Sequence, residues 1–302
     1  MRPLKQMTFT QFALPLAATL SIATSTLLPV SSDAAGFDPQ PIIQQAIEIE
    51  KRHDARIGIA VLDDETGTAW SYKGDVRFPL NSTFKAFACA ALLAQVDDGT
   101  TDPNKSVQIK RADIAPYSPV TKKQIGKTMT YLGLCNAAVT ISDNTAANYI
   151  LKEIGGPAGL SAFLRKLGDT ETRLDRWEPE LNNVPAGELR DTTTPLAAAT
   201  TLKTLLLGGP LSANSRKQLT DWLVANKVGD TLLRAGLPQR WKIGDKTGAD
   251  AKKSRGDIAV IWPRPDRAVF VAVYLDEAHV EMSSRNAAIA EIGRALTKAL
   301  AP

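Results

Sequence analysis

The sequence predicts a two-lobed protein of the α/β plus all-α class, in which an antiparallel sheet is flanked by helices. Three observations lead to this fold. Strand-like runs lie near both ends of the chain, a helical pattern accompanies them at each end, and the long middle is rich in Ala and Leu with helical periodicity. Because the strands are split between the ends, we expect residues 35–78 and 223–302 to form one discontinuous α/β lobe. Residues 79–222 would form an all-α lobe inserted into it.

The α/β lobe begins with a predicted helix and hairpin. Apolar residues recur at helical spacing over residues 39–52, which predicts an amphipathic helix. Two strand-like runs follow, at residues 56–62 and 68–72, and the turn-forming residues between them predict a hairpin.

The middle and the end of the chain complete the two lobes. Apolar spacing predicts helices over residues 84–96 and 144–153 in the middle. A cleft between two such lobes is a usual place for a small-molecule site. Three strand-like runs and a last amphipathic helix are predicted at residues 241–244, 257–262, 268–275 and 284–300.

Residues 1–34 have the pattern of a secretory signal peptide. Arg2 and Lys5 form a positive start, an apolar stretch spans residues 12–30, and a small-x-small site ends at Ala34. The alternative is an uncleaved membrane anchor, which the Ser and Thr residues within the apolar stretch disfavour. We therefore expect cleavage after Ala34 and a periplasmic or secreted protein that is not held at the membrane.

Composition argues against several classes of function. The 302-residue chain has a formal net charge of +4 and no basic stripe interleaved with aromatics, so no nucleic-acid partner is expected. His53 and His279 are its only histidines, which argues against a zinc site built on histidines and against a Ser-His-Asp hydrolase. The only cysteines, Cys89 and Cys135, form either a disulfide or two separately buried thiols.

Ser82 and Lys85 form the first candidate catalytic pair. On a helix, residues three apart lie on one face, so the Lys85 amine can reach the Ser82 hydroxyl. A serine becomes a good nucleophile when a neighbouring base takes its proton, and a desolvated lysine can be that base. Taken alone, the motif is common by chance and is better explained by a capped surface helix.

Two further triplets follow along the chain. Ser142-Asp143-Asn144 stands at the start of a helical pattern, where the alternative is a simple N-cap cluster. Lys246-Thr247-Gly248 follows a strand-like run, where the alternative is a turn; its glycine would let a ligand approach the strand edge. Each triplet is weak evidence, but a serine, a lysine, a hydroxyl-bearing triplet and a cationic strand in this order are strong evidence together.

In this order the motifs resemble those of class A β-lactamases and penicillin-binding proteins. A fourth segment, Arg-Trp-Glu-Pro-Glu-Leu-Asn at residues 176–182, resembles the Ω-loop of class A β-lactamases. The resemblance covers nearly the whole mature chain and looks closest to the penicillinase and carbenicillinase subgroup. It implies the two-lobed serine β-lactamase and DD-peptidase-like fold, with an Ω-loop at about residues 173–191.

The resemblance implies a role for each residue of the acylation step. Ser82 attacks the ring carbonyl, and the oxyanion lies between the backbone N–H groups of Ser82 and Ala249. Ser142 relays a proton toward the departing ring nitrogen. The acylation base is either Lys85 or Glu178 acting through water.

Release of the acyl group needs a second base, which the resemblance assigns to Glu178, with Asn182 helping to hold the water. The resemblance also implies an ion pair between Arg176 and Asp191 that closes the Ω-loop, and a disulfide Cys89–Cys135. It implies no metal ion and no cofactor.

Substrates of this family carry a carboxylate, so cations are expected to gather opposite it. Asn286 would orient the cation Arg255, for which a plain surface arginine is the alternative, and Tyr117 would wall the cleft or only pack. Asn144 would bond the amide of the substrate side chain. The implied substrate-binding residues are Tyr117, Asn144, Lys246, Thr247, Gly248 and Arg255.

The resulting hypothesis is an exported, monomeric class A serine β-lactamase. It would hydrolyse the ring amide of penicillin-type antibiotics through a serine acyl-enzyme and so confer resistance, with the β-lactam as its small-molecule partner. The alternatives are a penicillin-binding DD-peptidase, which would not need Glu178 and Asn182, and a non-catalytic β-lactam sensor.

The sequence does not set the substrate spectrum or the inhibitor sensitivity. The carbenicillin-hydrolysing subgroup typically has Arg where this chain has Lys246. Asn81 and Asp250 stand at the positions of a cysteine pair that marks the carbapenem-hydrolysing branch, so that branch is not supported. The Asp250 carboxylate would either repel anionic side chains of substrates or face solvent.

Overall fold

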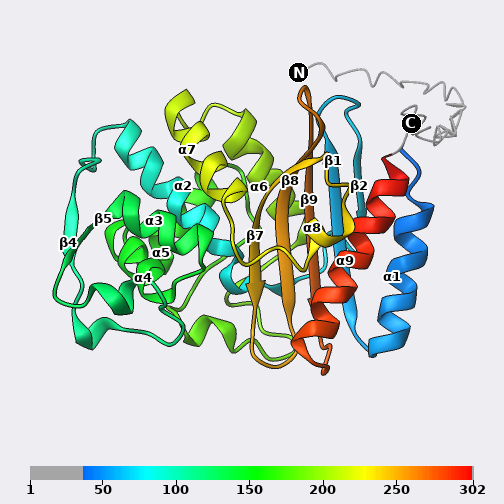
Figure 1. Cartoon of the computed structure of the whole chain (residues 1–302), viewed down its shortest axis with the longest axis horizontal. Coiled ribbons are helices and arrows are strands. Elements are labelled where there is room, and N and C mark those ends of the chain that lie inside the picture. The colour runs from blue at the N-terminus through cyan, green and yellow to red at the C-terminus, as the bar shows by residue number, and fades with distance from the viewer. Residues whose placement is uncertain (1–36, 301–302) are drawn as a thin grey trace, which may run out of the picture. The chain divides into compact units, whose positions relative to one another are not determined.

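The computed structural model describes residues 37–300, so the predicted signal peptide and its cleavage site after Ala34 lie outside the described residues. A five-stranded antiparallel sheet is the centre of the fold, with strand order β2-β1-β9-β8-β7 (Figure 1). Its strands come from the two ends of the described chain: β1 (Arg56–Asp63), β2 (Ala69–Tyr72), β7 (Lys242–Ala249), β8 (Arg255–Arg264) and β9 (Arg267–Asp276). The predicted antiparallel sheet and the β1–β2 hairpin are therefore confirmed.

Both faces of the sheet are buried, which is why its central strands are nearly continuous apolar runs. Successive side chains of a strand point to opposite faces. In β1, Ile57 and Ile59 accordingly pack on one side, with the helices α1 (Gln40–His53) and α9 (Met282–Ala299), whereas Ala60 lies in the core on the other side. Figure 1 shows α1 and α9 together beside the sheet, as the amphipathic patterns at the two ends of the chain predicted.

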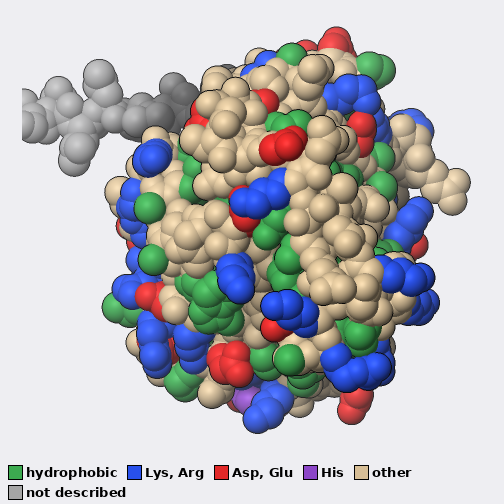
Figure 2. Space-filling model, turned by 90° about the vertical axis from the view of Figure 1, so that its left-hand side faces the viewer, with side chains coloured by type: hydrophobic (Ala, Val, Ile, Leu, Met, Phe, Trp, Pro, Cys, Tyr) green, Lys and Arg blue, Asp and Glu red, His purple; other side chains and the backbone are tan. Residues whose placement is uncertain are grey.

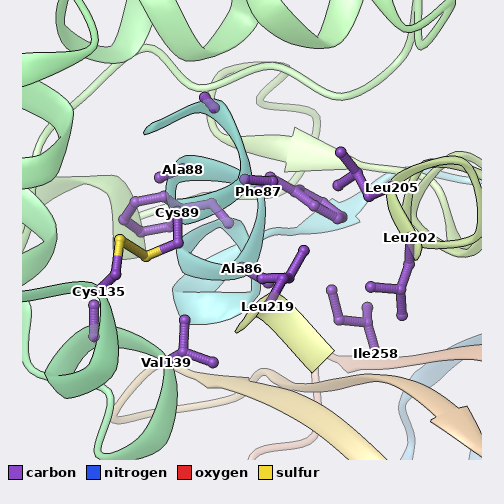
Figure 3. Close-up of a cluster of buried hydrophobic side chains, with 14 of the residues drawn as sticks. Ala86, Phe87, Ala88, Cys89, Cys135, Val139, Leu202, Leu205, Leu219 and Ile258 are labelled. Atoms are coloured by element: carbon purple, nitrogen blue, oxygen red, sulfur yellow. A yellow bond between two sulfur atoms is a disulfide. The ribbon is translucent and has the colours of Figure 1, made fainter. Parts of the chain in front are cut away.

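The other core cluster surrounds α2 (Phe84–Asp97), the helix that follows the predicted nucleophile. This helix is buried on nearly all sides because its sequence is apolar all round, apart from Lys85 and its last turn. Figure 3 shows Phe87 among side chains from neighbouring helices and the disulfide between Cys89 and Cys135. The helices of this part are α3 (Tyr131–Thr140), α4 (Asn144–Glu153), α5 (Gly156–Lys166), α6 (Pro195–Leu207) and α7 (Ala213–Val224), while the short α8 (Leu233–Gly236) packs on α9.

The middle of the chain also holds short strands that the sequence did not predict. They form two small antiparallel pairs, β3–β6 and β4–β5. Strands this short leave no periodicity in the sequence, and β3–β6 joins segments more than a hundred residues apart. Their bounds are β3 (Phe78–Pro79), β4 (Ser106–Gln108), β5 (Thr128–Thr130) and β6 (Thr192–Thr193).

The described surface carries charges of both signs. On the face shown in Figure 2, Lys and Arg side chains are interspersed with Asp and Glu. None of the helices between residues 37 and 300 is both long and apolar enough to cross a membrane.

Candidate active site

Ser82 lies in a single 3₁₀ turn, η1 (Asn81–Thr83), which leads directly into α2. The turn begins with Asn81 in the left-handed backbone region at φ 43°, so the chain bends sharply between β3 and the helix. Ser82 is half-buried, and Lys85, one helical turn later, is completely buried. The Lys85 Nζ atom lies 2.8 Å from Ser82 Oγ, as the three-residue spacing predicts.

Lys85 is surrounded by oxygen atoms from three segments of the chain. Its Nζ atom lies 2.9 Å from the Ser142 carbonyl, 2.5 Å from Asn144 Oδ1 and 3.0 Å from Glu178 Oε1. Burial lowers the pKa of the Lys85 amine below its ordinary value, while the nearby Glu178 carboxylate opposes that shift. The surroundings thus bring a buried amine, a buried carboxylate and the Ser82 hydroxyl together.

The second triplet is held in place by Asp143. Its carboxylate caps α4 by accepting from the Ala146 N–H, and it also accepts from the backbone and the hydroxyl of Thr121. Asp143 is therefore the buried structural residue that an N-cap cluster predicts. On either side of it, Ser142 takes the left-handed backbone conformation and Asn144 turns toward Lys85.

Tyr117 also lines the cleft, with 59% of its surface exposed. Its carbonyl accepts from the backbone N–H of Asn144 at 3.1 Å, and the neighbouring Pro116 carbonyl accepts from the Asn144 side-chain amide at 2.8 Å. The segment before α4 thus holds Asn144 from both sides.

The third triplet lies within β7, the edge strand of the sheet, and not in a turn after the strand. The predicted strand, residues 241–244, was therefore too short. Gly248 allows β7 to approach the nucleophile turn, because a Cβ atom there would stand 3.0 Å from the Leu80 carbonyl and 3.1 Å from Asn81 Cβ. The Lys246 Nζ atom lies 3.1 Å from Ser142 Oγ, which also contacts Lys85.

Arg255 and Asn286 contact each other as predicted. Arg255 Nε donates to Asn286 Oδ1 at 2.7 Å, and Nη1 donates to the Gly248 carbonyl at 2.9 Å. The guanidinium is therefore fixed beside β7 and borders the cleft.

Asp250 lines the cleft and does not face solvent freely, because its side chain is only 11% exposed. Its Oδ1 atom accepts from the backbone N–H groups of residues 252, 253 and 254, and it forms an ion pair with Arg285. The carboxylate thus caps the β7–β8 turn. The backbone N–H groups of a tight turn are donors that satisfy an adjacent carboxylate, which is why Asp250 does not face solvent.

Glu178 enters the site from the loop between α5 and β6. Asn148 of α4 holds its backbone on both sides, because the Asn148 amide accepts from the Glu178 N–H at 3.0 Å and donates to its carbonyl at 2.9 Å. Its side chain is fully buried, with Oε1 3.3 Å from Ser82 Oγ and Oε2 2.6 Å from Asn182 Nδ2. The predicted Arg176–Asp191 ion pair closes this loop.

These segments surround a cleft of about 510 Å³. Lys85, Glu178 and Lys246 are buried beneath it. Between residues 37 and 300, no three His, Cys, Asp or Glu side chains are grouped to hold a metal ion. The predicted residues on the cleft surface are Ser82, Tyr117, Ser142, Asn144, Asn182, Thr247, Gly248, Ala249 and Arg255.

Four residues of this region were not predicted to take part in the site. Asn81, Asn148, Ser254 and Arg285 hold Asn182, Glu178 or the β7–β8 turn by hydrogen bonds. Asn148 could have been found, since it lies one helical turn after Asn144 on the same face of α4. The other three act across segments far apart in the chain.

A serine beside a buried lysine, with a hydroxyl-bearing triplet and a cationic edge strand around one cleft, is the arrangement of the penicillin-recognising serine enzymes. Residues 41–300 match the β-lactamase enzyme family, and the chain belongs to that family.

Curated relatives and solved structures place the chain in class A. It is 45% identical to the β-lactamase AER-1 of Aeromonas hydrophila, over 97% of this chain and 96% of that protein. It is 46% identical to the β-lactamase CARB-3 of Pseudomonas aeruginosa, over 91% of this chain and 96% of the relative.

Two solved structures share the fold at high sequence identity. The class A β-lactamase of the last common ancestor of Gram-negative bacteria is 54% identical, with a TM-score of 0.83 over 84% of this chain and 97% of that one. A β-lactamase from Xanthomonas campestris is 42% identical, with a TM-score of 0.84 over 85% and 97%. The two-lobed fold and the class A assignment expected from the sequence are thereby confirmed.

Proposed function

We propose that this class A β-lactamase opens the β-lactam ring with Ser82 and is freed again with the help of Glu178. The enzyme hydrolyses the β-lactam ring amide and so confers resistance. The observation that carries the proposed mechanism is the buried Glu178 carboxylate, whose Oε1 atom lies 3.3 Å from Ser82 Oγ. A DD-peptidase or a β-lactam sensor would not need a base at that place.

In the acylation step, Ser82 Oγ attacks the ring carbonyl carbon and loses its proton to one of two bases within reach. Lys85 Nζ lies at 2.8 Å, and Glu178 Oε1 lies at 3.3 Å and could also act through a water. The lowered pKa of the Lys85 amine makes the neutral, proton-accepting form easier to reach than in an exposed lysine. The backbone N–H groups of Ser82 and Ala249 bind the oxyanion.

Collapse of the tetrahedral adduct breaks the ring C–N bond, and the departing nitrogen takes a proton from the Ser142 hydroxyl. Ser142 Oγ lies 3.4 Å from Lys85 Nζ and 3.1 Å from Lys246 Nζ, so its lost proton can be replaced by a neighbouring amine. This geometry supports Ser142 as the relay between the base and the leaving group.

In the deacylation step, Glu178 takes a proton from a water that attacks the acyl carbon. The ester bond to Ser82 Oγ then breaks, and Ser82 recovers its proton as the ring-opened acid leaves. Asn182 lies 2.6 Å from Glu178 Oε2 and opens onto the cleft, which supports its role in holding that water.

We further propose how the cleft binds its substrate. Lys246, Thr247 and Arg255 face the substrate carboxylate from β7 and β8, and Gly248 leaves room for the ring beside the strand edge. Asn144 bonds the amide of the substrate side chain, and Tyr117 walls the opposite rim. No nucleic-acid partner is proposed.

The domain organisation and the cellular location are also proposed. Residues 35–78 and 223–302 would form the α/β lobe, and residues 79–222 the helical lobe with the Ω-loop at about residues 173–191. After cleavage behind Ala34, the enzyme would be a periplasmic or secreted monomer. The disulfide supports this location, because disulfides persist in oxidising compartments.

Replacement of Glu178 tests the proposed mechanism. In Glu178→Ala, we expect rapid acylation of Ser82 with Lys85 as the base, followed by a stalled acyl-enzyme, because the loop no longer supplies a base to activate the water. Nitrocefin turnover should fall by at least about a hundredfold, while mass spectrometry of the quenched protein should show one bound acyl group.

Glu180→Ala is the matched control, because Glu180 is an exposed carboxylate on the same loop. It should keep wild-type turnover. Steady turnover by Glu178→Ala without accumulation of acyl-enzyme would contradict the mechanism.

A further inference from the structure

A chain of hydrogen bonds leads from the β7–β8 turn to the carboxylate of Glu178. Ser254 Oγ donates to Asn81 Oδ1 at 2.9 Å, Asn81 Nδ2 donates to Asn182 Oδ1 at 3.2 Å, and Asn182 Nδ2 donates to Glu178 Oε2 at 2.6 Å. Asn81 and Ser254 are each only 1% exposed. These contacts join three segments that are far apart in the sequence, and Asn81 is the residue between them.

The direction of every hydrogen bond in this series follows from the end at Glu178. Asn182 Nδ2 contacts Glu178 Oε2 and also the Pro179 carbonyl at 3.1 Å, and an ionised carboxylate and a carbonyl can only accept. The amide oxygen of Asn182 must therefore face Asn81, which must present its nitrogen. The Asn81 oxygen is then left for Ser254, whose hydroxyl donates.

We propose that Asn81 is a positioning residue for deacylation, which acts by fixing the orientation of the Asn182 amide. This inference rests on the proposed roles of Glu178 and Asn182. With the Asn81 donor in place, Asn182 directs its N–H group at Glu178, and its oxygen keeps a second lone pair for the water. Without that donor, the amide is free to turn over and to place its oxygen against the Glu178 carboxylate.

Burial makes the orientation important. In a site of low dielectric, an oxygen facing an ionised carboxylate is repelled, and a buried polar atom without a partner is costly. The Asn182 amide would then no longer hold the Glu178 carboxylate in place. Acylation with Lys85 as the base uses Ser82, Lys85 and Ser142 and does not depend on which way the Asn182 amide points.

The far end of the chain is held by the β7–β8 turn. The Ser254 N–H donates to Asp250 Oδ1 at 2.9 Å, and the Ser254 carbonyl accepts from Arg285 at 3.1 Å. The Asp250 cap thus fixes the hydroxyl that orients Asn81. This connects a residue at the rim of the cleft with the base for deacylation.

Asn81→Asp is the sharpest test because it keeps the shape of the side chain and replaces the donor by a carboxylate oxygen, with one added negative charge. Asp, like Asn, tolerates the left-handed backbone conformation that Asn81 adopts at φ 43°. We expect the deacylation rate constant to fall at least about tenfold and the acylation rate constant to change less. Quenched samples analysed by mass spectrometry should therefore contain accumulated acyl-enzyme.

The ratio of the deacylation to the acylation rate constant is the readout that a purely structural role of Asn81 would not move. Loss of packing alone would lower stability and slow both steps alike, whereas a turned Asn182 amide slows deacylation selectively.

Ser254→Ala separates orientation from the added charge of the first variant. It removes the donor that orients Asn81 but introduces no carboxylate, so we expect the same selective effect at about threefold. Thr201→Val is the control, because it removes a buried hydrogen bond to Asp169 far from the cleft. It should lower stability and leave the ratio of the two rate constants unchanged.

Wild-type ratios of deacylation to acylation in both Asn81→Asp and Ser254→Ala would overturn the proposal. If Asn81→Asp does not fold, Ser254→Ala decides alone. Failure of this inference can be distinguished from failure of the proposed mechanism. If only this inference fails, Glu178→Ala still accumulates acyl-enzyme; if the mechanism fails, it does not.

Discussion

At the scale of single residues, the Lys246 amine combines complete burial with two neighbouring cations, Lys85 and Arg255. Burial first, and the charge of Lys85 second, lower the pKa of Lys246 well below that of an ordinary lysine, although the Asp245 and Asp257 carboxyls oppose the shift. A lysine is charged only below its pKa. The positive charge that would face the substrate carboxylate is therefore lost at a lower pH than an ordinary lysine would lose it.

We accordingly expect kcat/KM for a penicillin to decrease with rising pH, and this alkaline limb should lie below the pH at which an ordinary lysine loses its proton. Lys246→Arg should move this limb to higher pH, because a guanidinium keeps its charge throughout that range. The measurement is the pH dependence of kcat/KM. Lys242→Arg, at the exposed start of the same strand, should leave the limb in place. Identical alkaline limbs in wild type and Lys246→Arg would refute the assignment.

At the scale of elements, the Ω-loop depends on one buried carboxylate. Asp191 is fully buried; its Oδ1 atom accepts from the N–H groups of Asp175 and Arg176, and Oδ2 pairs with the Arg176 guanidinium. The segment between them carries Glu178. The same interactions that close the loop therefore hold the proposed base above Ser82.

The Ω-loop should unfold more easily in the Asp191→Asn variant. Asn tolerates the positive φ of 59° at this position but lacks the charge, so Arg176 loses its partner. We expect the free energy of unfolding to fall by about 3 kcal/mol and deacylation to slow as Glu178 becomes less well placed. Urea denaturation measures the first effect and acyl-enzyme accumulation the second.

Glu188→Gln is the control for this loop, because it breaks a pair with the exposed Arg190 at the protein surface. Exposed pairs contribute little, so this variant should be close to wild type in both measurements. An Asp191→Asn enzyme as stable as the control would argue against the role of the ion pair.

At the scale of the whole molecule, the helix that carries Ser82 and Lys85 is enclosed by the core and joined to α3 by the Cys89–Cys135 disulfide. The bond closes a loop with a sequence separation of 46, which corresponds to about 4 kcal/mol of stabilisation in loop-entropy models. Oxidation of this pair and removal of the signal peptide belong to the same proposed event, export of the chain.

Expression of the full chain in a Gram-negative host tests that event. We expect periplasmic protein with the mass of residues 35–302, without reactive thiols, eluting as a monomer from a sizing column. Thiol titration and intact mass provide the readout, and the same chain without residues 1–34, retained in the cytosol, provides the reduced control. A periplasmic product that keeps residues 1–34 or has free thiols would contradict the proposal.

Local patterns in the chain predicted the order of the catalytic motifs and most of the helices and strands. Ser82 and Lys85 meet because they are one helical turn apart, and the helix over residues 144–153 follows from its apolar spacing. These are local relations, and helical or strand periodicity records them in the chain. The family resemblance then supplied Glu178, which no local pattern could have connected with Ser82.

The contacts between distant segments appear only in the folded chain. The third triplet lies inside an edge strand, the Asp250 carboxylate caps a turn, and Asn81 joins Ser254 to Asn182. The Asp250 cap depends on the N–H groups of a folded turn, and the contacts of Asn81 join side chains more than a hundred residues apart. Hydrogen-bond partners of this kind leave no period in the sequence, because packing and backbone direction decide which polar atoms meet.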